Sequence, residues 1–380
     1  MMLHLSFLQQ ELKSVFIMTR HGIRTPTKVF QQDQQYWNCS NVNLYSFQYK
    51  DEQPKNTELK IRFDIKNHLN GSCFIGQLMD KGFVQHQELS NLWQELYGDL
   101  YQYAEFRSTI MHRVIVSLVG QLTNIQNNYT QQILGKSVHK IRVATKHMDS
   151  AVICNNCSWG IGYLKNTVKQ MNNQKYIQND KQLDQMLNDF QQKIKQKALW
   201  VHIGDHVKAK LAVNYSISAL SPNEIQNAVD ITNDHWRKLF ILNNSFHDRY
   251  IKTAIGSLIE YLNEKINTKQ TTIVSAHDSS LAPLISIIVR DDQWNSGQPG
   301  FASFIAIEQY KSDGELYIQI RLRDGSEGKG IYVIQKACND YKCSTKSFQQ
   351  YIEQFQITIQ ERTKLCKETF NEKQYFDYSV

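Results

Sequence analysis

The stretch that decides the fold reads Val15-Phe16-Ile17-Met18-Thr19-Arg20-His21-Gly22-Ile23-Arg24-Thr25-Pro26, near the start of a chain of 380 residues. Val15 to Met18 is a short apolar run, which is typical of a strand buried in a sheet. The polar cluster Thr19 to Pro26 follows at once and indicates that the strand ends in a loop. We therefore expect the side chains of this cluster to gather at one end of a sheet.

A second stretch has the same organisation and begins with the β-branched run Thr271-Thr272-Ile273-Val274-Ser275. The segment Ala276-His277-Asp278-Ser279-Ser280 follows as a polar loop, and the apolar stretch Leu281 to Val289 comes after it. This order predicts a strand, a loop and a helix. In an open α/β sheet the ligand crevice lies outside the carboxyl ends of the strands, so both loops are candidates for a site.

Arg20, His21 and Arg24 bring two guanidinium groups and an imidazole to the end of the first strand. Two fixed cations beside a histidine imply an anionic substrate. The planar donor fork of arginine matches phosphate oxygens in a bidentate manner and does not lose its proton, and Gly22 lets the backbone approach closely. The alternative interpretation is an exposed basic loop after a strand.

His277 and Asp278 add an imidazole and an acid from a different strand. Phosphoryl transfer through a covalent intermediate needs one imidazole as nucleophile and a carboxylic acid that protonates the leaving oxygen. A His-Asp dipeptide taken alone is more often a loop cap than a catalytic pair. The two loops predict the chemistry only in combination.

Helices and strands between and after these loops complete an α/β pattern. Apolar residues at helical spacing from Leu78 to Leu96 predict a helix over the sheet, and a second helix is expected from Arg113 to Leu122. Alternation from Leu316 to Leu322 predicts a hairpin with Ile331 to Ile334, and a polar-faced helix is expected from Phe348 to Phe370.

Residues 125 to 265 differ in composition, because they are rich in Asn, Gln and Lys. Leu183, Met186, Phe190 and Ile194 have helical spacing, and few segments resemble strands. We interpret this part of the chain as a mainly helical insertion.

Composition excludes several classes of protein. Hydrophobic residues make up 41% of the chain and charged residues 21%, which is globular composition and not that of a disordered scaffold. The net charge is +7, but the basic residues are scattered, so no nucleic-acid-binding arm is predicted. No window approaches the roughly 18 apolar residues of a membrane span.

Four segments in order resemble the histidine acid phosphatase family, the branch of the histidine phosphatases that includes acid phosphatases and phytases. Arg20 to Pro26 resembles its Arg-His-Gly-x-Arg-x-Pro signature, and His277-Asp278 its His-Asp pair. Gly76 to Gln85 is similar to its Gly-Gln-Leu-Thr-x-x-Gly-x-x-Gln segment, and Arg107 to Arg113 to its Arg-Ser-Thr-Asp-x-Asp-Arg segment. The resemblance spans about residues 10 to 370.

The resemblance implies a role for each matching residue. His21 would be the nucleophile that forms a phosphohistidine, and Asp278 would donate a proton to the leaving alcohol and later help water attack. Arg20, Arg24 and Arg113 would clamp the phosphate, with His277 as a further phosphate ligand. No metal or other cofactor is expected, since preorganised cations provide the main stabilisation of such a transfer.

The fold that we expect is a three-layer α/β/α sandwich (phosphoglycerate-mutase-like) with an inserted, mainly α cap. The core would comprise residues 10–125 and 266–380 and the cap residues 126–265, with the active crevice between them.

Some positions depart from the family pattern. Ile110 and His112 replace two aspartates that precede the last arginine of the clamp, and Val114 replaces a threonine after it. If those acids hold the arginine, Arg113 is less rigidly aimed here. Ile23 lies inside the signature at a position that is often small or acidic. None of these changes removes a reacting group.

The cysteines suggest an oxidising compartment. Cys338 with Cys343 resembles a short C-terminal disulfide of the family, and Cys157 with Cys366 a bridge between the insertion and the last helix. Cys39, Cys73 and Cys154 remain, and we favour Cys39 with Cys73. A zinc or redox role for Cys154 and Cys157 lacks a second ligand pair and the usual redox-loop context.

The compartment that we expect is the secretory route, with a secreted protein or one of the lysosomal or vacuolar lumen. Asn-x-Ser/Thr sequons favour glycosylation, although an Asn-rich chain also produces them by chance. They occur at Asn38, Asn70, Asn128, Asn156, Asn214 and Asn243. Residues 1–9 show no complete signal peptide, and we interpret the true N-terminus as lying upstream.

The leading function is hydrolysis of phosphate monoesters at acidic pH, with a small phosphomonoester as partner; a homodimer is left open. A phytase would need cap cations facing the pocket, for which Lys28, Lys208 and Lys210 are candidates. A phosphate- or lipid-binding relative without turnover is the third hypothesis. A zinc site at His202 and His206 lacks a third ligand, and His86 is interpreted as a packed residue.

Overall fold

The structure is a computed structural model that describes part of the chain. The described residues are 10–30, 34–42, 48–50, 58–60, 69–123, 125, 131–133, 136–138, 141–143, 157–160, 162, 180–217, 220–241, 245–294 and 297–368.

Strand β1 (Glu11–Arg20) lies inside the main sheet, which has eight strands in the described part of the chain. The order is β11-β10-β9-β1-β8-β4-β7, and β12 pairs with β10. β1 runs parallel to β8, and β4 runs parallel to both β8 and β7. β9 is antiparallel to β1 and starts the antiparallel half of the sheet. The other strands of this sheet are β4 (Glu105–Ser108), β7 (Arg142–Val143), β8 (Thr272–Ala276), β9 (Phe304–Ser312), β10 (Glu315–Arg323), β11 (Ile331–Val333) and β12 (Lys342–Ser344).

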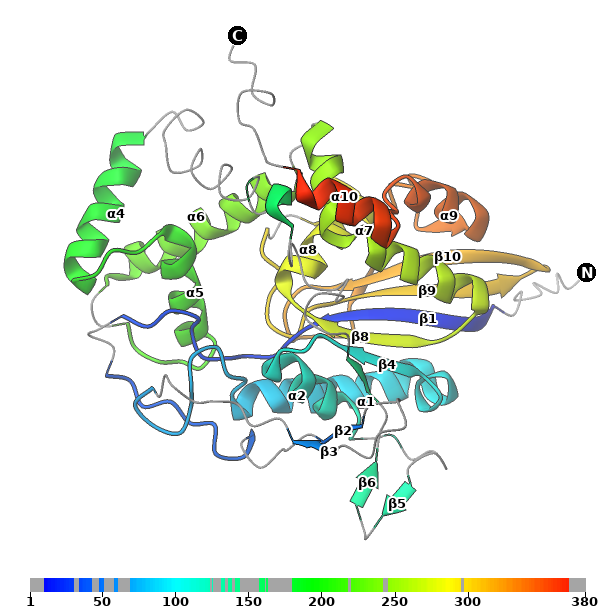
Figure 1. Cartoon of the computed structure of the whole chain (residues 1–380), viewed down its shortest axis with the longest axis horizontal. Helices are drawn as coiled ribbons and strands as arrows, with labels where there is room; N and C mark the ends of the chain where they lie inside the picture. Colours follow the sequence, from blue (N-terminus) through cyan, green and yellow to red (C-terminus); the bar gives the residue numbers. More distant parts are fainter. Residues whose placement is uncertain are drawn as a thin grey trace, which may run out of the picture.

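The alternation of side chains along β1 divides the core into two layers. Val15 and Ile17 pack in the cluster that contains Leu89 and Trp93 of helix α1 (Asp80–Gln102). Phe16 and Met18 point to the opposite face, where they pack in the cluster that holds helices α7 (Ser245–Thr268) and α8 (Asp278–Ile288). Successive side chains of a strand point to opposite faces, so a run that is apolar throughout needs helices on both sides. The predicted three-layer α/β/α fold is confirmed (Figure 1).

The remaining helices and short strands complete the described architecture. Two further helices, α9 and α10, form in the C-terminal segment for which one helix was expected. The elements are β2 (Gln48–Lys50), β3 (Glu58–Lys60), α2 (His112–Gln121), β5 (Gln131–Ile133), β6 (Lys136–Val138), α4 (Asp180–Ile194), α5 (Trp200–Leu211), α6 (Pro222–Ile241), the 3-10 turn Asp291–Gln293, α9 (Thr345–Glu353) and α10 (Ile359–Lys367).

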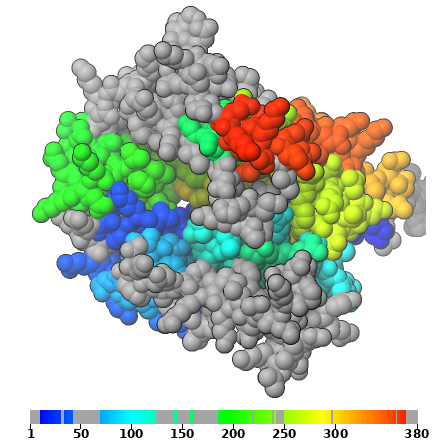
Figure 2. Space-filling view, in the orientation of Figure 1, coloured from blue at the N-terminus to red at the C-terminus, as the bar shows by residue number. Residues whose placement is uncertain are grey.

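Helices α4, α5 and α6 form a separate small core beyond the end of the sheet. Its buried residues include Phe190 of α4, Trp200 and Ile203 of α5, and Phe30 from the loop after β1. Gly204 allows α5 and α6 to pack closely, since a Cβ there would lie 1.8 Å from Oγ1 of Thr232. In the space-filling view these green helices lie beside the blue segment that follows β1 (Figure 2).

Helix α7 belongs to the layers of the core by its packing. Tyr250, Ile255 and Leu258 of α7 are buried in the same cluster as Phe16 of β1. The short strand β7, also within residues 126–265, pairs with β4 in the main sheet. We therefore propose that the cap proper is formed by α4, α5 and α6, and that the predicted segment 126–265 also supplies parts of the core.

Three disulfides join the pairs that the sequence analysis favoured. Cys39 is bonded to Cys73, Cys157 to Cys366, and Cys338 to Cys343. Of the sequon asparagines, Asn38, Asn70 and Asn214 are exposed, whereas Asn128, Asn156 and Asn243 lie outside the described residues, as does Cys154. Within the described ranges, no helix combines the length and the apolar character that crossing a membrane would require.

Candidate active site

The pairing of β1 with β8 brings the two predicted loops together. Arg20 is opposite Ala276 in the register of the two parallel strands. The backbone N–H of His21 donates to the carbonyl oxygen of Ala276 at 3.1 Å, and the rings of His21 and His277 lie edge to face with centroids 5.7 Å apart. The two histidines are therefore neighbours because their strands are neighbours.

The loop after β1 is fixed by helices α1 and α2. The N–H of Gly22 donates to Oγ of Ser117, and the N–H of Ile23 donates to Oε1 of Gln85. A Cβ at Gly22 would lie 2.3 Å from the carbonyl oxygen of Gly82, in the first turn of α1. Only glycine permits this approach of the two backbones. The loop thus reaches the site already oriented.

His21 presents one ring nitrogen for reaction. Its Nδ1 lies 2.9 Å from the carbonyl oxygen of Gly22. Since a carbonyl can only accept, Nδ1 carries the proton and Nε2 carries the lone pair. Burial, reinforced by the charges of Arg113, Arg20 and Arg24, holds the pKa of His21 well below its ordinary value. The imidazole is therefore neutral, which a nitrogen nucleophile requires.

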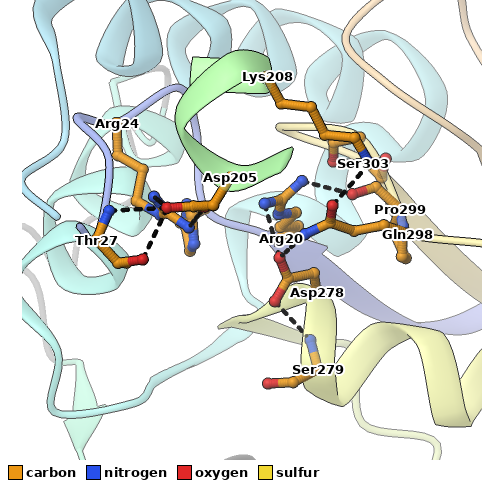
Figure 3. Close-up of polar contacts among 12 residues, drawn as sticks. Arg20, Arg24, Thr27, Asp205, Lys208, Asp278, Ser279, Gln298, Pro299 and Ser303 are labelled. Carbon is orange, nitrogen blue, oxygen red and sulfur yellow. Dashed lines mark hydrogen bonds and ion pairs between the residues drawn. The ribbon is translucent and has the colours of Figure 1, made fainter. Parts of the chain in front are cut away.

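Arg20 is held by contacts on three sides. One terminal nitrogen lies 2.7 Å from Oδ2 of Asp278, and the other donates to the carbonyl oxygen of Pro299 at 2.5 Å (Figure 3). The guanidinium also lies over the ring of Phe301, 4.3 Å from its centroid. Burial lowers the pKa of Arg20, and Asp278 opposes that effect.

Arg24 is paired with a carboxylate from the cap. Its two terminal nitrogens donate to Oδ1 of Asp205 at 2.6 Å and to Oδ2 at 3.3 Å. Oδ2 also accepts from the N–H and the hydroxyl of Thr27, at 2.8 and 2.7 Å (Figure 3). Burial lowers the pKa of Arg24, but Asp205 more than compensates and raises it.

Arg113 is the second residue of α2 and interacts electrostatically with Arg20 and Arg24. Burial, together with the charges of Arg24 and Arg20, lowers the pKa of Arg113 to about 10. Its own charge lowers the pKa of both His21 and His277. In the part of the chain that the structure describes, the Nε–H groups of Arg20, Arg24 and Arg113 are buried with no protein hydrogen-bond partner. They are available as donors to an anion.

His277 is the N-cap residue of α8, and its ring contacts Thr109, the residue that follows β4. Its Nε2 lies 3.0 Å from Oγ1 of Thr109. Burial, with the charge of Arg113, lowers the pKa of His277 to about 3, so this imidazole is also neutral. If the Thr109 hydroxyl donates to Nε2, Nδ1 of His277 carries a proton that it can give to an anion.

Asp278 is an ion in the absence of substrate. Its Oδ1 accepts from the N–H of Ser279 at 2.7 Å, and Oδ2 accepts from the amide of Gln298 at 2.8 Å beside Arg20. Burial raises its pKa, but the attraction of Arg20 and Arg24 outweighs burial and lowers it. Lys208 of α5 donates to Oε1 of Gln298 at 2.8 Å and so joins the cap to this network.

The structure brings together all six predicted site residues, Arg20, His21, Arg24, Arg113, His277 and Asp278. Sequence reasoning missed Asp205, Thr109, Gln298 and Phe301. Asp205 lies in the compositionally biased insertion, where no motif marks it. Thr109 lies inside the recognised Arg107 to Arg113 segment, which was the available signal.

Two further histidines of the described residues, His86 and His206, take structural positions. His86 is fully buried, with Nδ1 3.0 Å from the amide nitrogen of Gln121, and burial lowers its pKa to about 3. His206 packs against the ring of Phe30. In the described ranges, no three His, Cys, Asp or Glu side chains form a group able to hold a metal ion.

The departures from the family pattern surround Arg113. Helix α2 begins after Met111 without a side-chain cap, and His112 packs edge to face against Phe74. Burial, with the charge of Arg113, lowers the pKa of His112 to about 4. A neutral ring therefore stands at one position where the family carries an acid.

Comparison with protein families gives a match to the histidine phosphatase superfamily (branch 2) over residues 11–221, more than half of the chain. Counting factor 60 of Dictyostelium discoideum is 30% identical over 130 residues. That segment is 30% of this chain and 31% of that protein, so the match spans less than a third of the relative's length.

Solved structures of phytases have a similar fold. The phytase of Citrobacter braakii superposes with a TM-score of 0.62 at 13% identity, covering 91% of this chain and 98% of that one. The Hafnia alvei phytase in complex with tartrate has a TM-score of 0.61 at 10% identity, covering 92% of this chain and 99% of that one. The D. castellii phytase has a TM-score of 0.54 at 14% identity, covering 98% of this chain and 86% of that one. Identities this low show a shared fold alone.

The protonation state of His21 is directly testable. We expect its ring to stay neutral, with the proton on Nδ1, between pH 7 and pH 5, because a lowered pKa means that protonation occurs only at more acidic pH. Nitrogen chemical shifts of ¹⁵N-histidine-labelled protein would report this, with His21→Gln to assign the signal. A His21 signal that titrates near the ordinary value of about 6.5 would contradict the assignment.

Proposed function

Because this chain belongs to the histidine phosphatase superfamily, branch 2, we propose that it is an acid phosphatase that hydrolyses phosphate monoesters through a phosphohistidine on His21. One observation carries the proposal. The neutral imidazole of His21, with the lone pair on Nε2, lies among the charges of three arginines. The carboxylate of Asp278, which pairs with one of these arginines, lies at the end of the neighbouring strand. Each group has a defined part in the reaction.

In the first step, Nε2 of His21 attacks phosphorus as the bond to the leaving oxygen breaks. The imidazole becomes positively charged, and the carbonyl oxygen of Gly22 stabilises that charge through Nδ1–H. Arg20, Arg24, Arg113 and His277 would bind the equatorial phosphate oxygens, where negative charge is spread. Guanidinium groups supply this stabilisation, so the proposed route needs no metal ion.

Asp278 provides the proton for the leaving alkoxide. In the free protein it is ionised, because Arg20 and Arg24 lower its pKa. A bound phosphate competes for the donors of Arg20 and adds negative charge beside the carboxylate, and both effects raise that pKa. A phosphomonoester with a second pKa of about 6 carries one proton at acidic pH. We propose that this proton is transferred to Asp278, which gives the preference for acidic pH.

In the second step, water attacks phosphorus and the P–N bond breaks. The carboxylate of Asp278, which has lost its proton to the alcohol, accepts one from the water molecule. His21 returns to its neutral form with the proton on Nδ1, and inorganic phosphate takes the proton from Asp278 as it leaves, which restores the carboxylate. Atoms and protons balance over the two steps, with water as final acceptor.

Two alternative functions use the same residues. The phytase hypothesis draws on the cap cations, but Nζ of Lys208 donates to Asn233 and Gln298, and Nζ of Lys28 donates to the carbonyl oxygen of Lys197. A phosphate-binding relative without turnover would keep the clamp and fail to transfer phosphate.

We further propose that the protein is a glycoprotein secreted or held in a lysosomal or vacuolar lumen, which its disulfides support.

The phosphohistidine tests the proposed function. Brief incubation with ³²P-labelled substrate at pH about 5, with a chelator present, followed by an alkaline quench, should trap acid-labile label on the wild-type protein. His21→Ala should trap none and lose turnover, while inorganic phosphate still binds through the arginines. Label on a serine, or turnover without a labelled intermediate, would overturn the mechanism; binding without any turnover would support the inactive relative.

Asp278→Asn tests the proton donor, since it keeps size and polarity but removes the proton. General acid catalysis contributes typically about 10²–10⁴-fold, and less when the leaving oxygen is already a good anion. We expect a far larger loss on glycerol phosphate than on nitrophenyl phosphate. Single-turnover phosphorylation rates should be compared, because dephosphorylation of His21 is common to both substrates. Equal losses would show that Asp278 is not the donor.

A further inference from the structure

Asp205, on the cap helix α5, accepts its hydrogen bonds from another part of the chain. Four donors converge on its two carboxylate oxygens: both terminal nitrogens of Arg24, and the N–H and hydroxyl of Thr27. Arg24 and Thr27 both belong to the loop that follows β1. Asp205 comes from α5, far away in sequence, and its side chain is only 12% exposed.

The same donor set would suit a phosphate group. An arginine fork, a backbone N–H and a hydroxyl are the donors that proteins present to phosphate oxygens. Arg24 is also part of the proposed clamp for the reacting phosphate, so this set adjoins the clamp directly. Asp205 thus occupies a place where a second anion would otherwise find ready donors.

We propose that Asp205 fills a second anion subsite beside the phosphate clamp and thereby selects substrates whose phosphate has no neighbouring phosphate. The proposal rests on the proposed function and narrows its substrate class to isolated phosphomonoesters. A second phosphate on the adjacent carbon of the substrate would have to take donors that Asp205 already holds, against the charge of its carboxylate. Selection against a competitor by a repulsive group is a common basis of specificity.

Helix α5, which carries Asp205, is held in place on both sides of this residue. The preceding residue, Gly204, packs so closely on Thr232 of α6 that a Cβ would lie 1.8 Å from Oγ1. One turn later, Lys208 is tied to Asn233 and Gln298. Because the carboxylate is also shielded from water, its charge is screened less than that of an exposed acid.

The experiment compares two substrates that share a ring. Steady-state kcat/KM should be measured at pH 5 for myo-inositol 1-phosphate and for inositol hexakisphosphate, on wild-type protein and on Asp205→Ala. We expect the ratio of hexakisphosphate to monophosphate to rise by at least about tenfold in the variant, because a buried repulsive charge is removed. If Asp205 only positions Arg24, the variant would have a lower kcat/KM for both substrates and an unchanged ratio. That result would overturn the proposal.

Two further variants separate the subsite from a general charge effect. Asp205→Ala combined with Thr27→Val removes one of the four donors as well as the carboxylate, and it should give a smaller gain than Asp205→Ala alone, since the hydroxyl would bind the second phosphate. Asp230→Asn removes one exposed acid from α6 and should leave the ratio at its wild-type value. A rise in Asp230→Asn equal to that in Asp205→Ala would assign the effect to net charge and contradict the subsite.

The test does not depend on turnover or on one variant. Asp205→Asn has the same shape and serves if Asp205→Ala does not fold. Calorimetric affinities for the two inositol phosphates give the same ratio from binding. If wild-type protein hydrolyses neither inositol phosphate nor nitrophenyl phosphate, the proposed function fails. An affinity ratio that still rises in the variant then supports the subsite, and an unchanged ratio overturns it.

Discussion

The register between β1 and β8 is the constraint on which the site depends. Because Arg20 lies opposite Ala276 in two parallel strands, the residues that follow each strand emerge side by side. This places His21 beside His277 and sets Asp278, at the start of α8, against Arg20. A shift of one residue would exchange the side chains of β1 between the two core clusters in which they pack and would separate the groups at the strand ends.

The charges gathered by this register carry a cost that the fold offsets with specific partners. Buried guanidinium groups repel one another and lose hydration. Asp278, the carbonyl oxygen of Pro299 and the ring of Phe301 stabilise Arg20, and Asp205 stabilises Arg24. Burial, reinforced by the same positive charges, lowers the pKa of His21 and keeps it neutral. An anion that binds here would relieve the repulsion, so the same buried charges that carry this cost favour the binding of an anion.

The sequence contained the reacting groups but not the contacts that control them. Arg20, His21, Arg24, His277 and Asp278 were predicted because each follows a short apolar strand, and Arg113 through the family resemblance. The α/β pattern followed from apolar runs and helical spacing. Asp205 and Gln298 could not be predicted, since they reach the site only through the packing of α5 and the path of the loop before β9. Helix α7 was assigned to the cap by composition, although its packing joins it to the core.

The central claim is that phosphorus is held between Nε2 of His21 and Asp278 by the arginines and His277. A crystal structure with orthovanadate, which adopts the geometry of phosphoryl transfer, measures this most directly. We expect vanadium bonded to Nε2 of His21, with the apical oxygen facing Asp278. The equatorial oxygens should lie within hydrogen-bond distance of Arg20, Arg24, Arg113 and His277. Vanadate bonded to Nδ1 or to another side chain, or bound away from His21, would contradict it.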